Sequence, residues 1–261
     1  MRLQVLSSGS EGNSTLVRGG ETTLLVDAGL GRIEMEARLE QARLPASAID
    51  HVLVTHGHLD HARSVGMIAK RAHATLHCAE AMMSHPSAKR AKSLATLRIG
   101  SDYDVPNRAG RDAIRVLPVP LPHDCDPTVA FALEQGGRKA VILTDIGRPD
   151  EAVARALHDP HVLVLEFNWD PELMESGPYP EMLRRRIRGG RGHLSNEQSA
   201  QMLRLLAGAN LHTLVLAHLS KKTNLPERAL AAARAELERA GLGHVRTLIA
   251  SQEEIGPEIE V

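Results

Sequence analysis

Three histidines and one aspartate stand within six residues of one another. They are His56, His58, Asp60 and His61. The apolar run at 51–54 just before them predicts a short buried strand, so these side chains are presented where a strand ends and a loop begins. Imidazole nitrogen and carboxylate oxygen suit zinc, manganese or iron. A histidine-rich surface loop is the plain alternative, but an aspartate among three histidines indicates a cation. The chain is therefore expected to fold around a metal-binding loop.

The composition limits the classes of protein to which the chain can belong. It has 261 residues, 43% of them apolar, which is enough for a sizeable core. The formal net charge is -1, so any recognition of phosphate has to come from local patches. Two phenylalanines, two tyrosines and one tryptophan argue against a base-stacking platform for single-stranded nucleic acid.

The sequence predicts a cytoplasmic protein that does not enter a membrane. The N-terminus lacks the long apolar region of a secretory leader, and no apolar run reaches membrane-spanning length. Cys78 and Cys125 are too few for a disulfide scaffold and are consistent with a reducing compartment.

The remaining pattern predicts strands at the front of the chain and then an alternation of strands and helices. Apolar and β-branched runs predict strands at 3–6, 15–17, 22–26, 75–77, 113–121, 129–133, 139–143, 162–165, 211–217 and 244–250. Amphipathic or capped stretches predict helices at 32–43, 150–157, 196–207 and 226–240. Gly136-Gly137 predicts a tight hairpin turn.

Several polar or basic stretches have both a functional and a plain interpretation. The loop at 7–13 could offer donors to an anion or be an ordinary polar turn. Five arginines between 184 and 191 could grip phosphates by forked hydrogen bonds, or form a solvated helix end. A second basic stretch is interpreted as a solvated face; it contains Lys89, Arg90, Lys92 and Arg98.

The spacing His56-x-His58-x-Asp60-His61 resembles the signature of the metallo-beta-lactamase superfamily, and the resemblance extends over essentially the whole chain. Three further stretches resemble the YycJ (WalJ) group of bacterial exonucleases, which is related to PhnP and RNase J. They are residues 8–14, 192–197 and 218–221. Only 72 residues separate Asp145 from His218, too few for the domain that RNase J-like proteins insert there.

The resemblance implies a fold and a set of metal ligands. The expected fold is α/β (α+β), a four-layer αββα sandwich of two mixed β-sheets flanked by helices, in a single domain over 1–261. Two divalent metal ions, zinc or manganese, are the expected cofactors. One ion is expected to bind His56, His58 and His123. The other is expected to bind Asp60, His61 and His218, with Asp145 bridging the two ions.

The resemblance also implies roles for residues around the ions. Asp27, Thr55 and Asp124 are expected to orient the ligands from behind. Glu166, Asn168 and Asp170, which follow a predicted strand, are expected to brace the site. Asp60 and His193 are the expected catalytic residues. His193 would contact or protonate the scissile phosphate, or instead cap the helix that begins at Ser195. The expected contacts to substrate phosphate are Ser10, Asn13, Arg191, Ser220 and Lys221.

The implied reaction is hydrolysis by a water or hydroxide shared by the two ions. The motifs of the subgroup favour a phosphodiesterase that degrades DNA as a 5'-to-3' exonuclease, with DNA as its partner. A hydrolase of small molecules, such as a cyclic phosphodiester, a thioester or a lactone, is the alternative. A metal-stabilised scaffold without turnover is a third hypothesis. The oligomeric state is left open.

Overall fold

The computed structural model describes residues 1–261. Contacts along the chain divide it into two compact units. The first unit comprises Met1–Pro118, Leu133–Arg138 and Ser251–Val261, and the second comprises Val119–Ala132 and Lys139–Ala250. None of the helices has both the length and the apolar character needed to span a bilayer. The expectation of a single domain over 1–261 stays a prediction.

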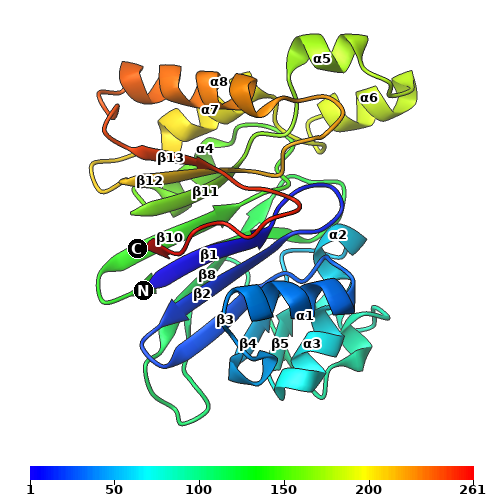
Figure 1. Cartoon of the computed structure of the whole chain (residues 1–261), viewed down its shortest axis with the longest axis vertical. Coiled ribbons are helices and arrows are strands. Elements are labelled where there is room, and N and C mark those ends of the chain that lie inside the picture. The colour runs from blue at the N-terminus through cyan, green and yellow to red at the C-terminus, as the bar shows by residue number, and fades with distance from the viewer. The chain divides into compact units, whose positions relative to one another are not determined.

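The first sheet belongs to the first unit and has the strand order β14-β1-β2-β3-β4-β5-β6. Its strands are β1 Arg2–Ser7, β2 Ser14–Gly19, β3 Thr22–Val26, β4 His51–Leu53, β5 Thr75–Cys78, β6 Ser93–Thr96 and β14 Ile259–Glu260. Neighbours from β14 to β3 run antiparallel, and those from β3 to β6 run parallel. Because β14 pairs with β1, both chain ends lie at one edge of this sheet (Figure 1).

Two helices cover one face of this sheet, and a third is short. They are α1 Arg32–Gln41, α2 Leu59–Ala62 and α3 Val65–Ala72. Met35 of α1 and Ile68 of α3 join the apolar cluster of Leu25 and Val52, and Figure 1 shows both helices beside β3, β4 and β5. Each such side chain contributes roughly 1.5–3 kcal/mol on burial. The short 3-10 helices of this unit are η1 Ala46–Ala48, η2 Glu80–Met82 and η3 Ala88–Arg90.

The second sheet has the strand order β13-β12-β11-β10-β9-β8-β7. Its strands are β7 Tyr103–Val105, β8 Ile114–Leu121, β9 Thr128–Gln135, β10 Arg138–Leu143, β11 Val162–Glu166, β12 Thr213–Ala217 and β13 Arg246–Ile249. The run from β10 to β13 is parallel, and β7 pairs antiparallel with β8. Gly136 and Gly137 have φ of 59° and 75°, as a two-residue hairpin turn requires. The predicted turn is confirmed.

Three of the five helices of the second unit begin at a side-chain cap. The five are α4 Glu151–Leu157, α5 Pro171–Ser176, α6 Glu181–Arg188, α7 Asn196–Leu206 and α8 Pro226–Arg239. Asp150 caps α4, Asp170 caps α5, and Ser195 with Gln198 forms a capping box on α7. The helix α5 is absent from the predictions because it shows little apolar periodicity.

The parallel pairing brings strand ends together within each unit. In the first unit Val26 pairs with Leu53, so the loops after β3 and β4 begin side by side. In the second unit Leu143 pairs with Leu165 and Leu165 with Leu216, so three more loops leave one edge. Ligands bind at the carboxyl ends of parallel strands in folds of this type. The predicted fold of two mixed sheets with flanking helices is confirmed.

Candidate metal centre

Asp27 holds the predicted metal loop from behind. Its Oδ1 accepts a hydrogen bond from the Thr55 backbone N–H at 2.8 Å, and its Oδ2 accepts one from the Thr55 hydroxyl at 2.7 Å. The same Oδ2 lies 2.7 Å from Nδ1 of His61. Asp27 and Thr55 therefore form one hydrogen-bonded group that holds the His61 ring through Nδ1. Their role in orienting a metal ligand stays a prediction.

These contacts decide which ring nitrogens of the first loop carry a lone pair. An ionised carboxylate only accepts, so Nδ1 of His61 donates to Asp27 and Nε2 keeps its lone pair. The Thr55 hydroxyl donates to Asp27 and so accepts from Nδ1 of His56, 3.1 Å away. Nε2 of His56 then faces Nδ1 of His58 at 3.1 Å. That separation matches the edge of about 3.3 Å between two nitrogens on a tetrahedral zinc.

Backbone groups just before β2 and just after β3 hold the first loop by hydrogen bonds. Asn13 N–H donates to the Asp60 carbonyl at 2.7 Å, Gly29 N–H to the Asn13 carbonyl at 3.0 Å, and Ala28 N–H to the His61 carbonyl at 2.9 Å. A Cβ at Gly29 would stand 1.7 Å from the Asp60 carbonyl oxygen. Only glycine permits this approach, and no local sequence pattern marks Gly29 for it.

Asn13 and Ser10 occupy different places in the loop before β2. Asn13 is buried, and its side chain bridges both backbone polar groups of Gly9 at 2.9 and 3.0 Å. Its Nδ2 also lies 3.0 Å from Nε2 of His61. Ser10 is exposed at the tip of the loop. Asn13 thus belongs to the wall of the first donor set, while contact of either residue with phosphate stays a prediction.

Three predicted site residues hold a left-handed backbone. Asp27, Asp145 and His218 have φ of 61°, 61° and 55°, immediately after β3, in the loop after β10 and immediately after β12. Non-glycine residues rarely adopt this conformation, which costs about 1–3 kcal/mol each. Asn168 helps to hold one of them, because its Nδ2 donates to the His218 carbonyl at 2.8 Å. Strain of this kind marks positions where the direction of the side chain matters.

Four side chains of the second unit form a compact donor group around Glu166. They are Asp145, Glu166, His193 and His218, whose candidate ligand atoms lie within 4.8 Å of one another. Oε1 of Glu166 accepts from Nδ1 of His193 at 2.7 Å and from Nδ1 of His218 at 3.1 Å. Oε2 accepts from the Ile146 N–H at 3.1 Å. In the neutral form of either ring Nε2 therefore carries the lone pair, whereas a protonated His193 carries a second proton at Nε2.

Glu166 is fully buried, yet it stays ionised. Burial raises the pKa of a carboxyl group, but the charge of His193 and the hydrogen bonds from His193 and His218 outweigh burial and hold the pKa of Glu166 below its usual value. If Glu166 braces the site as predicted, it does so as a buried negative charge that holds a proton on Nδ1 of His193 and of His218.

His123 is oriented through its backbone-facing nitrogen. Nδ1 donates to the Gly192 carbonyl at 3.0 Å, so Nε2 carries the lone pair, 4.0 Å from Oδ1 of Asp145. Burial lowers the pKa of His123, which favours the neutral ring that a metal requires. Oδ1 of Asp124 lies 3.3 Å from Nε2 of His123, and its Oδ2 accepts from Arg186 at 2.6 Å.

The arginine-rich stretch is largely neutralised by acids. Arg184, Arg185 and Arg188 form ion pairs with Glu175 or Glu181. Arg191 donates through Nε to the His123 carbonyl at 2.7 Å, and its Nη2 lies 3.7 Å from Asp126. Most of this stretch is therefore a solvated helix end whose arginines form ion pairs. Arg191 differs, because it donates a hydrogen bond to the backbone carbonyl of His123, a predicted ligand.

Two predicted phosphate contacts follow His218. Ser220 is buried, and its hydroxyl accepts from the Thr223 backbone N–H at 3.2 Å and from the Thr223 hydroxyl at 2.9 Å. Lys221 is exposed. The serine therefore shapes the turn after β12, and a contact of Ser220 or Lys221 with phosphate stays a prediction.

The donor atoms of each unit are of the kinds that bind divalent metal ions. Four histidines have Nδ1 committed as a donor, so each presents the lone pair of Nε2; they are His56, His61, His123 and His218. Carboxylates add oxygen donors, with Oδ2 of Asp60 lying 3.6 Å from Nε2 of His61. Imidazole oriented by a hydrogen bond at its other nitrogen is typical of metal sites in proteins.

Comparison with known proteins agrees with this geometry. A family model described as a beta-lactamase superfamily domain matches residues 22–219. The chain belongs to the metallo-beta-lactamase superfamily. The resemblance that begins at His56 is thereby confirmed, and the clusters of histidine and carboxylate described above are those of a metallo-beta-lactamase domain.

Relatives of this metallo-beta-lactamase chain include two bacterial proteins. Exodeoxyribonuclease YycJ of Bacillus anthracis is 29% identical over 252 residues, which cover 93% of this chain and 91% of the relative. Exodeoxyribonuclease WalJ of Streptococcus pneumoniae is 28% identical over 244 residues, covering 93% and 90%. The metallo-beta-lactamase fold protein YhfI from Bacillus subtilis superposes with a TM-score of 0.71 at 15% identity over 99% of both chains. That likeness shows the fold alone.

Proposed function

We propose that the chain is a dinuclear metal-dependent phosphodiesterase that degrades DNA as a 5'-to-3' exonuclease. Two relatives are named exodeoxyribonuclease YycJ and exodeoxyribonuclease WalJ, which supports DNA as the substrate. The observation that carries the metal-dependent part is the shared tautomer of four histidines, each of which presents Nε2 as its lone-pair nitrogen. Rings fixed in this way are prepared to bind a cation through Nε2.

The proposed ligands divide between the two units. One ion would be held by His56, His58 and His123, and the other by Asp60, His61 and His218, with Asp145 between them. This assignment requires the donor sets of the two units to meet. Two bound divalent ions would supply a water of lowered pKa and would neutralise charge on a phosphoryl oxygen.

The protein's own residues would orient these ligands and move a proton. Asp27 fixes His61, and Glu166 fixes His218. Glu166 also holds Nδ1 of His193, whose side chain is 22% exposed, so its Nε2 edge can face a substrate. A proton at Nε2 of His193 would pass to the leaving oxygen. The alternative helix-capping role belongs to Ser195, which caps α7 itself.

Contacts to the phosphate backbone complete the proposal. Ser10 and Lys221 are exposed, and the Arg191 side chain is 59% exposed beyond its bond to the His123 carbonyl. These three are the groups we propose as contacts to substrate phosphate. Asn13 and Ser220 would act through the loops that they hold.

The test is nuclease activity on double-stranded DNA labelled at the 5' or the 3' end. The protein is stripped of metal by chelation and reloaded separately with manganese or zinc, with Asp60→Ala as the control. Metal-dependent release of mononucleotides from the 5' end, lost in Asp60→Ala, is the expected result. Absence of cleavage with metal verifiably bound would refute the proposal.

A hydrolase of small molecules remains the second candidate. The formal net charge of -1 favours it, because the whole molecule does not attract a polyanion. A panel of chromogenic phosphodiesters, thioesters and lactones separates the two, since an exonuclease should prefer DNA over each of them in kcat/KM.

A further inference from the structure

A shallow hollow on the first unit is lined by basic side chains and no carboxylate. It has a volume of about 410 Å³, and its lining residues are Arg32, Met67, Lys70, Arg71, His73 and Lys92. These come from the start of α1, from α3 and the residue after it, and from the loop before β6. Arg90 adjoins the hollow, because its Nη1 lies 3.0 Å from the Met67 sulfur. We call this set of residues the basic hollow.

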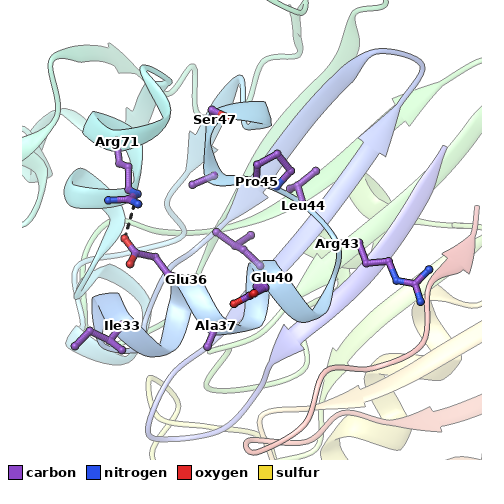
Figure 2. Close-up of a pocket in the computed structure, with 11 residues that line it drawn as sticks. Ile33, Glu36, Ala37, Glu40, Arg43, Leu44, Pro45, Ser47 and Arg71 are labelled. Carbon is purple, nitrogen blue, oxygen red and sulfur yellow. Dashed lines mark ion pairs between the residues drawn. The ribbon is translucent and has the colours of Figure 1, made fainter.

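The neighbouring hollow beside α1 shows the contrast. It has a volume of about 800 Å³ and mixes both charges, since Glu36 and Glu40 line it together with Arg43 and Arg71 (Figure 2). Figure 2 shows Glu36 and Arg71 pointing toward one another, and the two groups pair at 3.3 Å. Arg71 lines both hollows. Mixed charge is expected of an ordinary solvated surface, and the basic hollow departs from it.

A single carboxylate forms ion pairs with two cations of the basic hollow. Glu36 pairs with Arg32 at 2.9 Å and with Arg71 at 3.3 Å. Lys70 and Lys92 add two further charges to the lining. The four arginines of α6, in comparison, pair with three carboxylates, Glu175, Glu181 and Asp124. Positive charge is therefore left in excess at the basic hollow, in a chain whose formal net charge is -1.

Helix stability does not explain Arg32. It is the first residue of α1, where the helix dipole is positive and an acidic residue is favoured. Its pair with Glu36 also runs in the less favourable direction, with the cation on the N-terminal side. Lys70 and Arg71 stand in the last turn of α3, where cations are favoured anyway. Among the cations of the basic hollow, Arg32 is therefore the one whose position helix stability does not account for.

We propose that the basic hollow binds the phosphodiester backbone of duplex DNA, at a distance along the strand from the scissile phosphate. This inference rests on the proposed function, because it names a second contact to the same substrate. Guanidinium and ammonium groups around a shallow hollow fit phosphate oxygens, and such contacts position a duplex without reading its sequence. The low aromatic content fits contacts to the backbone rather than to stacked bases.

The experiment measures binding of the metal-loaded protein to duplex DNA whose end linkages are phosphorothioates, which slow hydrolysis. The test variant carries Arg32→Gln, Lys70→Gln and Lys92→Gln. The control carries Arg155→Gln, Arg234→Gln and Arg246→Gln, which removes the same charge from exposed positions of the second unit. Thermal midpoints of both variants check that they fold, and the single variant Lys70→Gln serves if the triple variant does not.

The expected result is a loss of affinity in the test variant of at least about tenfold at about 0.1 M salt, with a change of less than about threefold in the control. The salt dependence of log Kd should also fall, by about 0.9 for each phosphate contact removed. Equal affinity and equal salt slope in the two triple variants would overturn the inference. So would binding of the wild type to phosphatidylglycerol vesicles, lost in the test variant, without any loss in DNA affinity.

Failure of the inference and failure of the proposed function are distinguishable. If wild-type protein cleaves DNA and the test variant binds it normally, the basic hollow is not a DNA contact and the exonuclease proposal stands. If the wild type binds DNA through the basic hollow but does not cleave it with metal present, the inference stands and the exonuclease proposal is wrong.

Discussion

Asp27 shows how much one carboxylate does for the first donor set. It accepts hydrogen bonds from the Thr55 N–H and hydroxyl, and it fixes Nδ1 of His61. Its left-handed backbone, with φ of 61°, aims the carboxylate at the metal loop. Asparagine tolerates that backbone, so Asp27→Asn removes the charge without forcing a change of conformation.

Asp27→Asn should lower the affinity for divalent metal by about 10–100-fold, because an outer carboxylate raises the basicity of its histidine and holds the ring in place. Competition with a chromogenic chelator measures the affinity. Asp159→Asn is the matched control, since Asp159 also has a left-handed backbone, with φ of 58°, but accepts from Asn210 instead. Metal affinity equal to that of the control would show that Asp27 is only a turn residue.

His193→Ala should reduce kcat on DNA by about 10²–10⁴-fold while the metal content per chain stays unchanged. The reason is that Nδ1 of His193 is held by Glu166 and the other ring edge is partly exposed, as a proton donor to substrate requires. Exposed His244 provides the control variant His244→Ala. Loss of metal from the His193 variant, measured by elemental analysis, would assign it to metal binding instead.

In the first unit the loop after β3 lies against the predicted metal loop. Gly29 lies against the Asp60 carbonyl, and the N–H of Ala28 donates to the His61 carbonyl at 2.9 Å. Two segments that are far apart in sequence are thereby locked together. Close approach of two backbones fixes the main chain of Asp60 and His61, while the Asp27 side chain fixes the His61 ring.

Gly29→Ala should destabilise the protein by about 1–3 kcal/mol and lower its metal content, because the added methyl would stand 1.7 Å from the Asp60 oxygen. Urea unfolding and elemental analysis check the two effects. Gly31→Ala is the control two residues away, where an added Cβ meets nothing within 4 Å. If Gly29→Ala and Gly31→Ala lower the unfolding free energy equally, the contact between Gly29 and the Asp60 carbonyl does not constrain the loop.

A histidine pair joins β4 and β5. His51 Nε2 donates to the Pro106 carbonyl at 2.7 Å, so its Nδ1 accepts from Nε2 of His77 at 2.9 Å. Burial, together with the charge of His51, lowers the pKa of His77 to about 4. The folded protein thus favours neutral His77, while the unfolded chain takes up a proton near pH 6.5. The stabilising contribution is complete above pH 6.5 and is lost as the pH falls toward 4.

Between pH 7 and pH 5 the wild type should therefore lose about 2 kcal/mol more of its unfolding free energy than His77→Gln does. Urea denaturation at pH 7 and pH 5 gives the unfolding free energy of each protein. Subtracting the two proteins removes the pH dependence of the titrating groups that they share. His244→Gln, at an exposed position, should behave like the wild type. The same pH dependence in His77→Gln would mean that His77 is protonated in the folded state.

The sequence predicts these elements unevenly, for physical reasons. Buried strands such as β11 and β12 carry unbroken apolar runs, so their existence is visible in one sequence. Ser195 and Gln198 form a capping box, a local signal that predicts the start of helix α7. In contrast, the close approach at Gly29 and the left-handed backbones of Asp145 and His218 are set by packing between distant segments. No local pattern encodes them.

The candidate site divides in the same way across the whole molecule. The six-residue cluster from His56 to His61 is a local motif and is visible at once, while His123, Asp145 and His218 are expected only because the motif resembles a family. The tautomer-setting role of Glu166 and the excess charge of the basic hollow depend on residues brought together by the fold. The net charge of -1 does not reveal that hollow, and the basic stretch in the sequence supplies only Arg90 and Lys92 of its residues.

The central claim concerns both units, because the proposed ligands of each ion come from both. The most direct test is a titration of metal-free protein with manganese, in which the rate of DNA hydrolysis and the ions bound per chain are measured together. Turnover that rises until two ions are bound per chain, and that is lost in both Asp60→Ala and His218→Ala, is the predicted result. Full activity with one ion per chain, or in either variant, would contradict the claim.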